Sequence, residues 1–235
     1  MKSNLVTLTD NKSVAAEAYR TLRTNIQFSS YDKEMRVITV TSSRPGEGKS
    51  TVACNMAITF AENGNKVLLI DADLRRPTVH KKFKLPNSQG IVNIIMNHEL
   101  LEEITHSGVT EGLDIITSGV IPPNPSELLG SKKNQRLIER LREIYDVIIL
   151  DTPPLLAVTD AQVLTTISDG TVLVAQHGVT KKDEVMQAKA LLEKVNGNIL
   201  GVVLSQIPAD DNSYYYYYSY EDKKAGARTG KRSKK

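Results

Sequence analysis

The chain has 235 residues, 40% of them hydrophobic, and a formal net charge of +3, which suits one α/β domain built around one core. The small charge does not indicate nucleic acid binding, and a single cysteine, Cys54, excludes an intrachain disulfide and fits a reducing cytoplasm. No apolar run approaches the ~20 residues that cross a bilayer, no signal-peptide pattern opens the chain, and the histidines (His80, His98, His106, His177) lack zinc-site spacing.

Hydrophobic patterning alternates between helix and strand along most of the chain. An amphipathic helix, about Val14 to Phe28, precedes a first core strand, Arg36 to Ser42, and Gly64 ends a helix that begins near Ser50. The further strands are 67–71, 113–117, 147–151, 171–176 and 199–205, and the further helices lie around 137–145 and 182–195. The central strands are continuously apolar, as in a sheet covered on both faces. This order predicts a doubly wound, mostly parallel α/β sheet with helices on both faces.

The chain after residue 208 has a different composition. From Ala209 it consists of Asp, Asn, Ser, Tyr, Gly, basic and other small residues, with no aliphatic side chain larger than Ala. Such a segment cannot bury a core. We therefore predict a folded domain over residues 1–208 and a disordered tail over 209–235.

A glycine-rich string lies between the first core strand and the following helix. Residues 43–51 read Ser-Arg-Pro-Gly-Glu-Gly-Lys-Ser-Thr, and they supply the small residues, lysine and hydroxyl of a phosphate-binding P-loop. Ser43 replaces the usual first glycine of that motif. The alternative is a glycine turn before an ordinary helix, which the strand-loop-helix context disfavours. The residues that we predict to contact the nucleotide are Gly46, Glu47, Gly48, Lys49, Ser50 and Thr51.

Three aspartates follow apolar strands downstream of this loop. Asp71 and Asp73 leave the strand 67–71, and Asp151 ends the strand 147–151. Open α/β sheets bind their ligands at the carboxyl ends of the strands, and carboxylate oxygens are the ligands that Mg²⁺ prefers. A single aspartate at a strand end is usually a cap or turn former, but three on two strands favour a magnesium-nucleotide site.

Together these segments resemble the deviant-Walker P-loop ATPases, and most closely the bacterial tyrosine kinases of the capsular-polysaccharide family. Ser-x-x-Pro-Gly-Glu-Gly-Lys-Ser is similar to that family's Walker A, Asp-Ala-Asp-Leu-Arg-Arg-Pro (71–77) to its Walker A′, and Ile-Ile-Leu-Asp-Thr-Pro-Pro (148–154) to its Walker B. The loop 123–129 (Pro-Asn-Pro-Ser-Glu-Leu-Leu) also looks like a family loop near the active site. The resemblance covers nearly the whole chain, from Glu17 to the tyrosine tail.

The resemblance implies a role for each matching residue. Lys49 holds the ATP phosphates, and the Mg²⁺ ligands are Ser50, Asp71 and Asp151, the carboxylates acting directly or through water. Asp73 accepts or orients the tyrosine proton, a role for which Asp71 competes. A phenol of pKa ~10 is protonated at neutral pH, so its oxygen needs a carboxylate or metal beside it.

The resemblance also implies partners. Glu17, Arg20 and Arg23 resemble the family's Glu-x-x-Arg-x-x-Arg segment, which assembles a ring of subunits, although charge pairs on a solvated helix face explain the same residues. A membrane-embedded activator and a tyrosine phosphatase are further implied partners, and no nucleic acid is expected. We expect a cytoplasmic protein, held peripherally at the inner face of the cell membrane through a partner.

Two departures leave questions open. Partition-type relatives carry a signature lysine five positions before the P-loop lysine, where this chain has Arg44, either an inert loop residue or a phosphate contact across an interface. Relatives often read adenine with an asparagine at the end of the last strand, where this chain has Ser205 and Gln206. The rival interpretations are a partition or positioning ATPase of the MinD/ParA type and a nucleotide-loaded binding module.

Six of the nine tyrosines lie within seven consecutive residues of the predicted tail: Tyr214, Tyr215, Tyr216, Tyr217, Tyr218 and Tyr220. Five in a row point to all faces at once, which a packing role does not explain, and the alternative is an aggregation-prone or aromatic-binding tail. The tail has seven basic and four acidic residues and therefore a net charge of +3. Each phosphate group adds a charge of about −1.5 to −2, so two or three phosphates make the net charge of the tail negative. We predict autophosphorylation at these tyrosines, between subunits.

Overall fold

The computed structural model of the chain describes residues 5–29, 34–97 and 101–208. The chain divides into two units, Met1–Ser205 and Gln206–Lys235, and every helix and strand below belongs to the first. The predicted tail with its six tyrosines lies outside the described residues, so its boundary and its disorder stay predictions.

Helices and strands alternate from the first core strand onward, as the hydrophobic pattern predicts. The helices are α1 (Val6–Thr9), α2 (Val14–Phe28), α3 (Lys49–Glu62), α4 (Val79–Phe83), α5 (Ile91–Asn97), α6 (Leu101–Ile104), α7 (Pro125–Leu129), α8 (Lys132–Ile144), α9 (Asp160–Thr165) and α10 (Lys182–Lys194). The strands are β1 (Val37–Ser42), β2 (Val67–Asp71), β3 (His106–Thr110), β4 (Leu113–Ile116), β5 (Val147–Asp151), β6 (Gly170–Gln176) and β7 (Ile199–Ser205).

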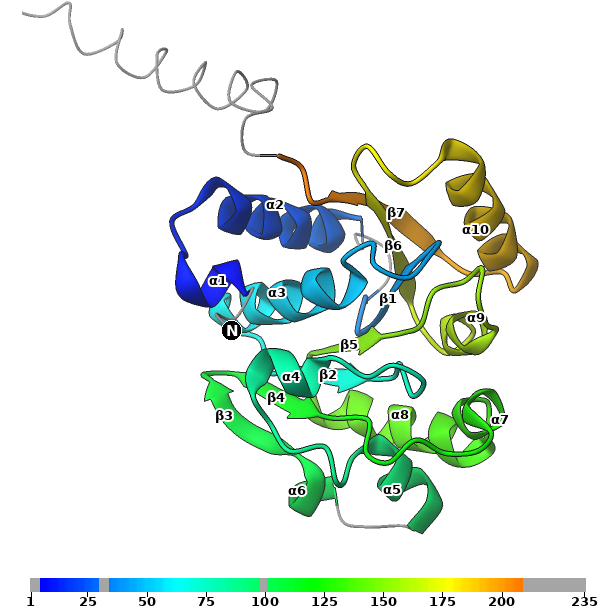
Figure 1. The fold of residues 1–235 in the computed structure, drawn as a ribbon. Coiled ribbons are helices and arrows are strands. Elements are labelled where there is room, and N and C mark those ends of the chain that lie inside the picture. The colour runs from blue at the N-terminus through cyan, green and yellow to red at the C-terminus, as the bar shows by residue number, and fades with distance from the viewer. Residues whose placement is uncertain (1–4, 30–33, 98–100, 209–235) are drawn as a thin grey trace, which may run out of the picture. The chain divides into compact units, whose positions relative to one another are not determined.

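The seven strands form one sheet in the order β3-β4-β2-β5-β1-β6-β7 (Figure 1). Neighbouring strands run parallel except for β3, which pairs antiparallel with β4 at one edge. The predicted mostly parallel sheet is therefore confirmed. Because β5 separates β1 from β2, the segments that follow these three strands emerge side by side at one edge of the sheet.

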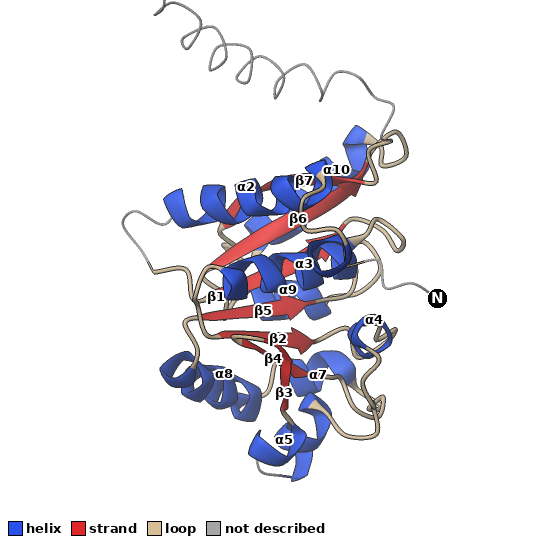
Figure 2. Ribbon diagram, turned by 90° about the vertical axis from the view of Figure 1, so that its left-hand side faces the viewer, coloured by secondary structure: helices blue, strands red, loops and turns tan. Residues whose placement is uncertain are grey.

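Two helical layers cover the sheet, one on each face (Figure 2). On β2, Leu69 packs in a cluster with residues of α3, whereas Leu68 and Ile70 pack in a second cluster with residues of α5 and α8. This alternation is the period of two of a strand whose faces are both buried. The helices begin where the sequence offers caps, because the Ser13 and Ser131 hydroxyls accept from backbone N–H groups in the first turns of α2 and α8.

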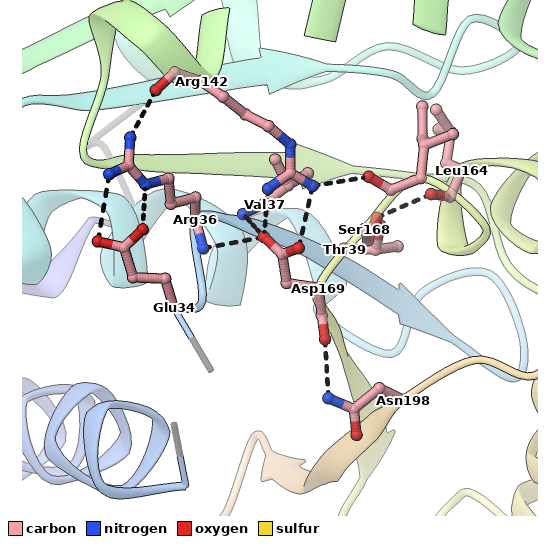
Figure 3. Close-up of polar contacts among 10 residues, drawn as sticks. Glu34, Arg36, Val37, Thr39, Arg142, Leu164, Ser168, Asp169 and Asn198 are labelled. Atoms are coloured by element: carbon pink, nitrogen blue, oxygen red, sulfur yellow. Dashed lines mark hydrogen bonds and ion pairs between the residues drawn. The ribbon is translucent and has the colours of Figure 1, made fainter. Parts of the chain in front are cut away.

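Asp169 ties together the amino-terminal edge of the sheet (Figure 3). Its Oδ2 accepts from the backbone N–H groups of Arg36 (2.9 Å) and Val37 (2.7 Å), at the start of β1. Arg142 of α8 donates to both Asp169 oxygens, at 2.7 and 3.0 Å. This cluster lies at the opposite ends of the strands from the glycine-rich loop, so it fixes the scaffold rather than the site.

Seven short elements were not predicted. β3 and the helices α1, α4, α5, α6, α7 and α9 have four to seven residues each, too few to show a hydrophobic period. The loop singled out at 123–129 in fact contains α7, which Pro125 opens. Over the residues that the structure describes, no helix is both long and apolar enough to span a bilayer.

Candidate active site

The glycine-rich loop connects β1 to α3 in a conformation that requires its glycines. Gly46 and Gly48 have φ of +89° and +88°, in the left-handed region that glycine adopts without steric penalty. Gly48 is the N-cap of α3, so the first turn of that helix directs its free N–H groups toward the loop. Space is open where a Cβ of Gly46 would lie, and Ser43 Oγ is buried with no hydrogen-bond partner. These features fit a phosphate.

Glu47 braces the loop from within the protein. Its Oε2 accepts from the backbone N–H of Arg44 (2.9 Å), and its Oε1 accepts from the hydroxyl of Thr180 in the loop after β6 (2.5 Å). Its backbone oxygen accepts from the hydroxyl of Ser205 at the end of β7 (2.5 Å). The nucleotide contact of Glu47 stays a prediction, and it would come from the backbone N–H, because the carboxylate is buried and engaged with the protein. Nothing in the sequence marked Thr180, whereas Ser205 stood out only as a departure from asparagine.

Lys49 lies among the predicted carboxylates. Its Nζ is 2.8 Å from Asp73 Oδ2, 3.7 Å from Asp151 Oδ1, and 3.2 Å from the hydroxyl of Ser50. Burial lowers the pKa of Lys49, but Asp151 and Asp73 outweigh it, so the pKa is raised overall and the ammonium stays charged. The fold therefore brings together the ammonium of Lys49, the hydroxyl of Ser50 and two of the three predicted aspartates.

Asp71 and Asp151 stand opposite each other on the neighbouring strands β2 and β5. Asp71 Oδ2 accepts from the backbone N–H groups of Thr78 (3.0 Å) and Val79 (2.9 Å), while Asp71 Oδ1 and both Asp151 oxygens are buried without a hydrogen-bond partner. Burial, reinforced by Asp151, raises the pKa of Asp71 to about 8, and burial raises the pKa of Asp151 despite the attraction of Lys49. Buried carboxylate oxygens in this condition fit a cation.

A divalent cation of the magnesium type suits this donor set. The described residues contain no cluster of three or more His, Cys, Asp or Glu side chains arranged for a metal. Mg²⁺ commonly takes only one or two carboxylates and completes its shell with phosphates and water. Asp71 and Asp151, together with the hydroxyl of Ser50, are therefore sufficient if the nucleotide supplies the remaining ligands.

The raised pKa of Asp71 leads to a testable pH dependence of stability. In the unfolded chain its pKa is ~3.9, whereas the native carboxyl keeps its proton up to a pKa of about 8. The native state binds more protons between these values, so this group lowers the free energy of unfolding as pH rises from about 4 to 8. Asp71→Asn removes this loss of stability. Without metal, the melting temperature of the variant should therefore exceed that of wild type at pH 8 and differ little from it at pH 4.5.

Thermal denaturation across this pH range, with and without Mg²⁺, provides the measurement. Added Mg²⁺ should raise the melting temperature of the wild type at pH 8 and reduce the advantage of Asp71→Asn, because the cation favours the ionised carboxylate. A variant whose stability follows wild type in parallel at all pH values would show that Asp71 is already ionised in the native state.

Two further contacts at the site were missed from the sequence. Lys82 of α4 donates to the hydroxyl of Thr51, at 2.8 Å, and its charge lowers the pKa of Asp151. Arg75 forms a bidentate pair with the fully buried Asp160 of α9, at 2.9 and 3.0 Å, and also donates to the hydroxyl of Ser126 on α7 (3.1 Å). In the sequence, only the run of basic residues after residue 79 could have indicated that Lys82 lies at the site. Arg75 belongs to a recognised motif, but its partner lies 85 residues away.

The other singled-out residues lie away from the carboxylates. Arg44 is exposed and pairs through Nε with Glu184 of α10, at 3.0 Å. On α2, Arg20 contacts Glu17 at 3.1 Å and Glu62 of α3 at 3.7 Å. Arg23 donates to the backbone oxygen of Thr59, at 2.9 Å. The structure thus shows the charge pairs of a helix face, and it holds Arg23 against α3.

Comparisons of the sequence and of the structure with known proteins agree with each other. An AAA domain family matches residues 35–199. The chain is 46% identical to the tyrosine-protein kinase YwqD of Bacillus subtilis over 205 residues, covering 87% of this chain and 86% of YwqD. The kinase domain of the Escherichia coli tyrosine kinase ETK superposes with a TM-score of 0.84 at 34% identity, covering 88% of this chain and 81% of that domain.

A protein of the partition or positioning type is a weaker match to this chain. The septum site-determining protein MinD of Pyrococcus horikoshii, in complex with Mg-ADP, superposes with a TM-score of 0.62 at 23% identity, covering 76% of each chain. At that identity the likeness concerns the fold alone. It agrees with a P-loop architecture and gives no support to a positioning function for this chain.

Proposed function

The chain belongs to the family of bacterial tyrosine-protein kinases, and on that premise we propose that it transfers the terminal phosphate of ATP to the tyrosines of its own tail, between subunits. The observation that carries the proposal is the set of buried carboxylates at the mouth of the phosphate loop. Asp71 and Asp151 hold oxygens without hydrogen-bond partners beside the ammonium of Lys49. A fold that buries carboxylate oxygens without hydrogen bonds favours an ionic ligand there.

Each side chain has a proposed part in the reaction. Lys49 exchanges its contact with Asp73 for the phosphates of ATP, which frees Asp73 Oδ2. The freed carboxylate then accepts or orients the phenolic proton, and Asp71, whose pKa burial raises to about 8, is the competing base. Ser50, Asp71 and Asp151 hold Mg²⁺, which when bound neutralises charge on the phosphates. Gly46, Gly48, Ser50 and Thr51 surround the phosphates with N–H and hydroxyl groups.

A magnesium titration of kinase activity tests these assignments. Asp151→Asn should lower the rate by about 10²-fold or more and raise the Mg²⁺ concentration for half-maximal activity, because it weakens a metal ligand. Asp73→Asn should lower the rate similarly but leave the Mg²⁺ midpoint near that of wild type. Equal Mg²⁺ midpoints in all three proteins would remove Asp151 from the metal site, and full activity in either variant would remove that residue from the reaction.

Two of the three remaining tyrosines, Tyr19 and Tyr145, are poor substrates in the folded domain. Burial raises the pKa of Tyr19 to about 12, and that side chain packs against the core cluster that contains α3. Tyr145 is buried and donates to Asp114 Oδ2 at 2.8 Å, with Lys66 Nζ 5.1 Å from its ring centroid. Tyr31 lies outside the described residues. These contacts support the tail as the substrate.

Chain length alone does not separate transfer within a subunit from transfer between subunits. Eight residues (206–213) lie between Ser205, which donates to Glu47 of the phosphate loop, and Tyr214, the first tyrosine of the tail. That many residues span up to ~30 Å when extended, which permits either route. The proposal of transfer between subunits comes from the ring that the family resemblance implies, in which every tail is equivalent and within reach of a neighbour.

We expect Arg20→Ala to weaken self-association. Arg20 is the partly exposed member of the predicted assembly segment, while Arg23 also holds α3, so Arg20 tests assembly with less effect on the fold. Size-exclusion chromatography with light scattering should give a lower mass for this variant than for wild type. Arg140→Ala, at an exposed position of α8, is the matched control. Equal masses for wild type and Arg20→Ala would leave these residues as charge pairs of a helix face.

By the same resemblance we propose a membrane-embedded activator, a tyrosine phosphatase and a role in making or exporting surface polysaccharide at the inner face of the cell membrane. A membrane-flotation assay with and without the activator tests that placement. The chain alone should stay with the soluble fraction.

A further inference from the structure

Two large apolar side chains protrude beside the candidate active site, although the rest of the site is polar. Val120 and Ile121 follow β4 and are 65% and 58% exposed. Leaving such side chains in water loses the stabilisation of burial, about 25 cal/mol per Å². The packing of the described domain gives them no role.

The loop that carries these side chains is held firmly at both ends. Asn87 braces its start, because Asn87 Oδ1 accepts from the backbone N–H of Gly119 (3.1 Å) and its Nδ2 donates to the backbone oxygen of Gly119 (3.2 Å). At its far end Pro122 is buried, and Pro125 opens α7. Proline fixes φ, so Val120 and Ile121 project from a segment with little conformational freedom. A surface held in this way loses little entropy when it binds.

The loop leaves the sheet next to the carboxylates. β4 pairs with β2 so that Ile116 stands opposite Ile70, one residue before Asp71. In Figure 2 the arrowheads of β2 and β5 point to the side on which α4 lies, which is the side of the phosphate loop. Beyond the loop, Ser126 accepts from Arg75, three positions after Ala72 on the segment that follows β2. The apolar pair therefore lies at the rim of the same site.

A cation on that segment has no side-chain partner in the part of the chain that the structure describes. Arg76 is exposed, and its backbone N–H donates to Asp73 Oδ1 at 3.0 Å, which fixes its position beside the site. Among the described residues its guanidinium takes part in no ion pair or side-chain hydrogen bond. The rim therefore offers an apolar loop together with an uncompensated positive charge.

We infer that Val120, Ile121 and Arg76 form a docking platform for the tyrosine segment of a second copy of this chain. The platform rests on the proposed function. Its chemistry matches that segment: consecutive tyrosines supply aromatic faces for the apolar side chains, and the segment is flanked by acids, Asp210 and Asp211 before it and Glu221 and Asp222 after it. When one tyrosine of the tail binds the platform, the tyrosine next to it in the sequence would place its hydroxyl in the active site. Several of the six tyrosines are then phosphorylated in turn.

The test uses a tagged Lys49→Met chain as the acceptor, because it keeps the tail and is expected to label nothing itself. Full-length wild type and the variant with Val120→Ser and Ile121→Ser are compared as enzymes over a range of acceptor concentrations. The platform variant should show a KM for the acceptor raised on the order of fivefold, about 1 kcal/mol of binding, with an unchanged KM for ATP. Arg76→Gln should raise the same KM and make it less sensitive to salt.

The matched control carries Val202→Ser and Leu204→Ser on the edge strand β7, where both side chains are similarly exposed, at 52% and 56%. Its KM for the acceptor should equal that of wild type. An unchanged KM in the platform variant overturns the docking site while leaving the kinase proposal intact. A rise in the KM for ATP, or a loss of assembly mass by light scattering, would instead identify these side chains as structural or as a contact between ring subunits. If wild type itself fails to label the acceptor, the proposed function fails first.

Discussion

Replacing Lys49 with methionine is expected to abolish tyrosine phosphorylation while leaving a folded protein. The change removes the ammonium that lies 2.8 Å from Asp73 and 3.7 Å from Asp151, but little side-chain volume. Preorganised charge at a phosphoryl-transfer site contributes about 10²- to 10³-fold or more to the rate. Labelling measured with an anti-phosphotyrosine antibody after incubation with Mg-ATP should fall at least that far.

Stability and nucleotide binding of the same variant separate chemistry from folding. Without Lys49 the buried carboxylates repel one another, so the melting temperature should drop at pH 8 and recover in part at pH 5, where Asp71 and Asp151, whose pKa values are raised, bind protons. Lys189→Met, at an exposed position of α10, is the control and should match wild type in both assays. Wild-type labelling by Lys49→Met would mean that the glycine-rich loop does not hold the phosphates.

Deleting residues 209–235 is expected to remove nearly all self-labelling without unfolding the domain. The deleted segment contains six of the nine tyrosines and no aliphatic side chain larger than alanine, so the core loses nothing. Of the three tyrosines that remain, Tyr19 packs against the core and Tyr145 is buried, and burial raises the pKa of both, which keeps their hydroxyls protonated. The truncated chain should keep its melting temperature and its affinity for ATP.

Mass spectrometry of the labelled proteins gives the readout for the truncation. A full-length variant with all six tail tyrosines changed to phenylalanine is the matched control, because it keeps the tail but offers no hydroxyl. Both proteins should carry little phosphotyrosine. A large fall in melting temperature, or undiminished labelling at Tyr19, Tyr31 or Tyr145, would show that the tail is not a separate substrate segment.

The sequence predicted the sheet well because its signals are local. The central strands are apolar runs such as the first four residues of Val67–Asp71, and the glycines of the phosphate loop stand between a strand and a helix. The same local pattern placed Lys49, Asp71, Asp73 and Asp151 at one edge, because parallel strands bring their carboxyl ends together.

The contacts that were missed depend on residues far apart in the chain. Glu47 is 133 residues from Thr180 and 158 from Ser205, and no local pattern indicates that its carboxylate turns inward rather than toward a nucleotide. The pairing of Arg75 with Asp160 is equally distant. The short helices α4 and α7 carry Lys82 and Ser126, and a helix of five residues is too short to show a helical hydrophobic period.

Mixing two complementary variants tests the central claim most directly. The chain lacking residues 209–235 keeps the active site but has no tail, and Lys49→Met keeps the tail but has no activity. Incubated together with Mg-ATP, they should yield phosphotyrosine at positions 214–220 of the Lys49→Met chain, at a rate that rises with the concentration of the truncated one. Absence of phosphotyrosine in the mixture, while full-length wild type labels itself at a rate independent of its concentration, would contradict transfer between subunits; absence in wild type as well would contradict the kinase itself.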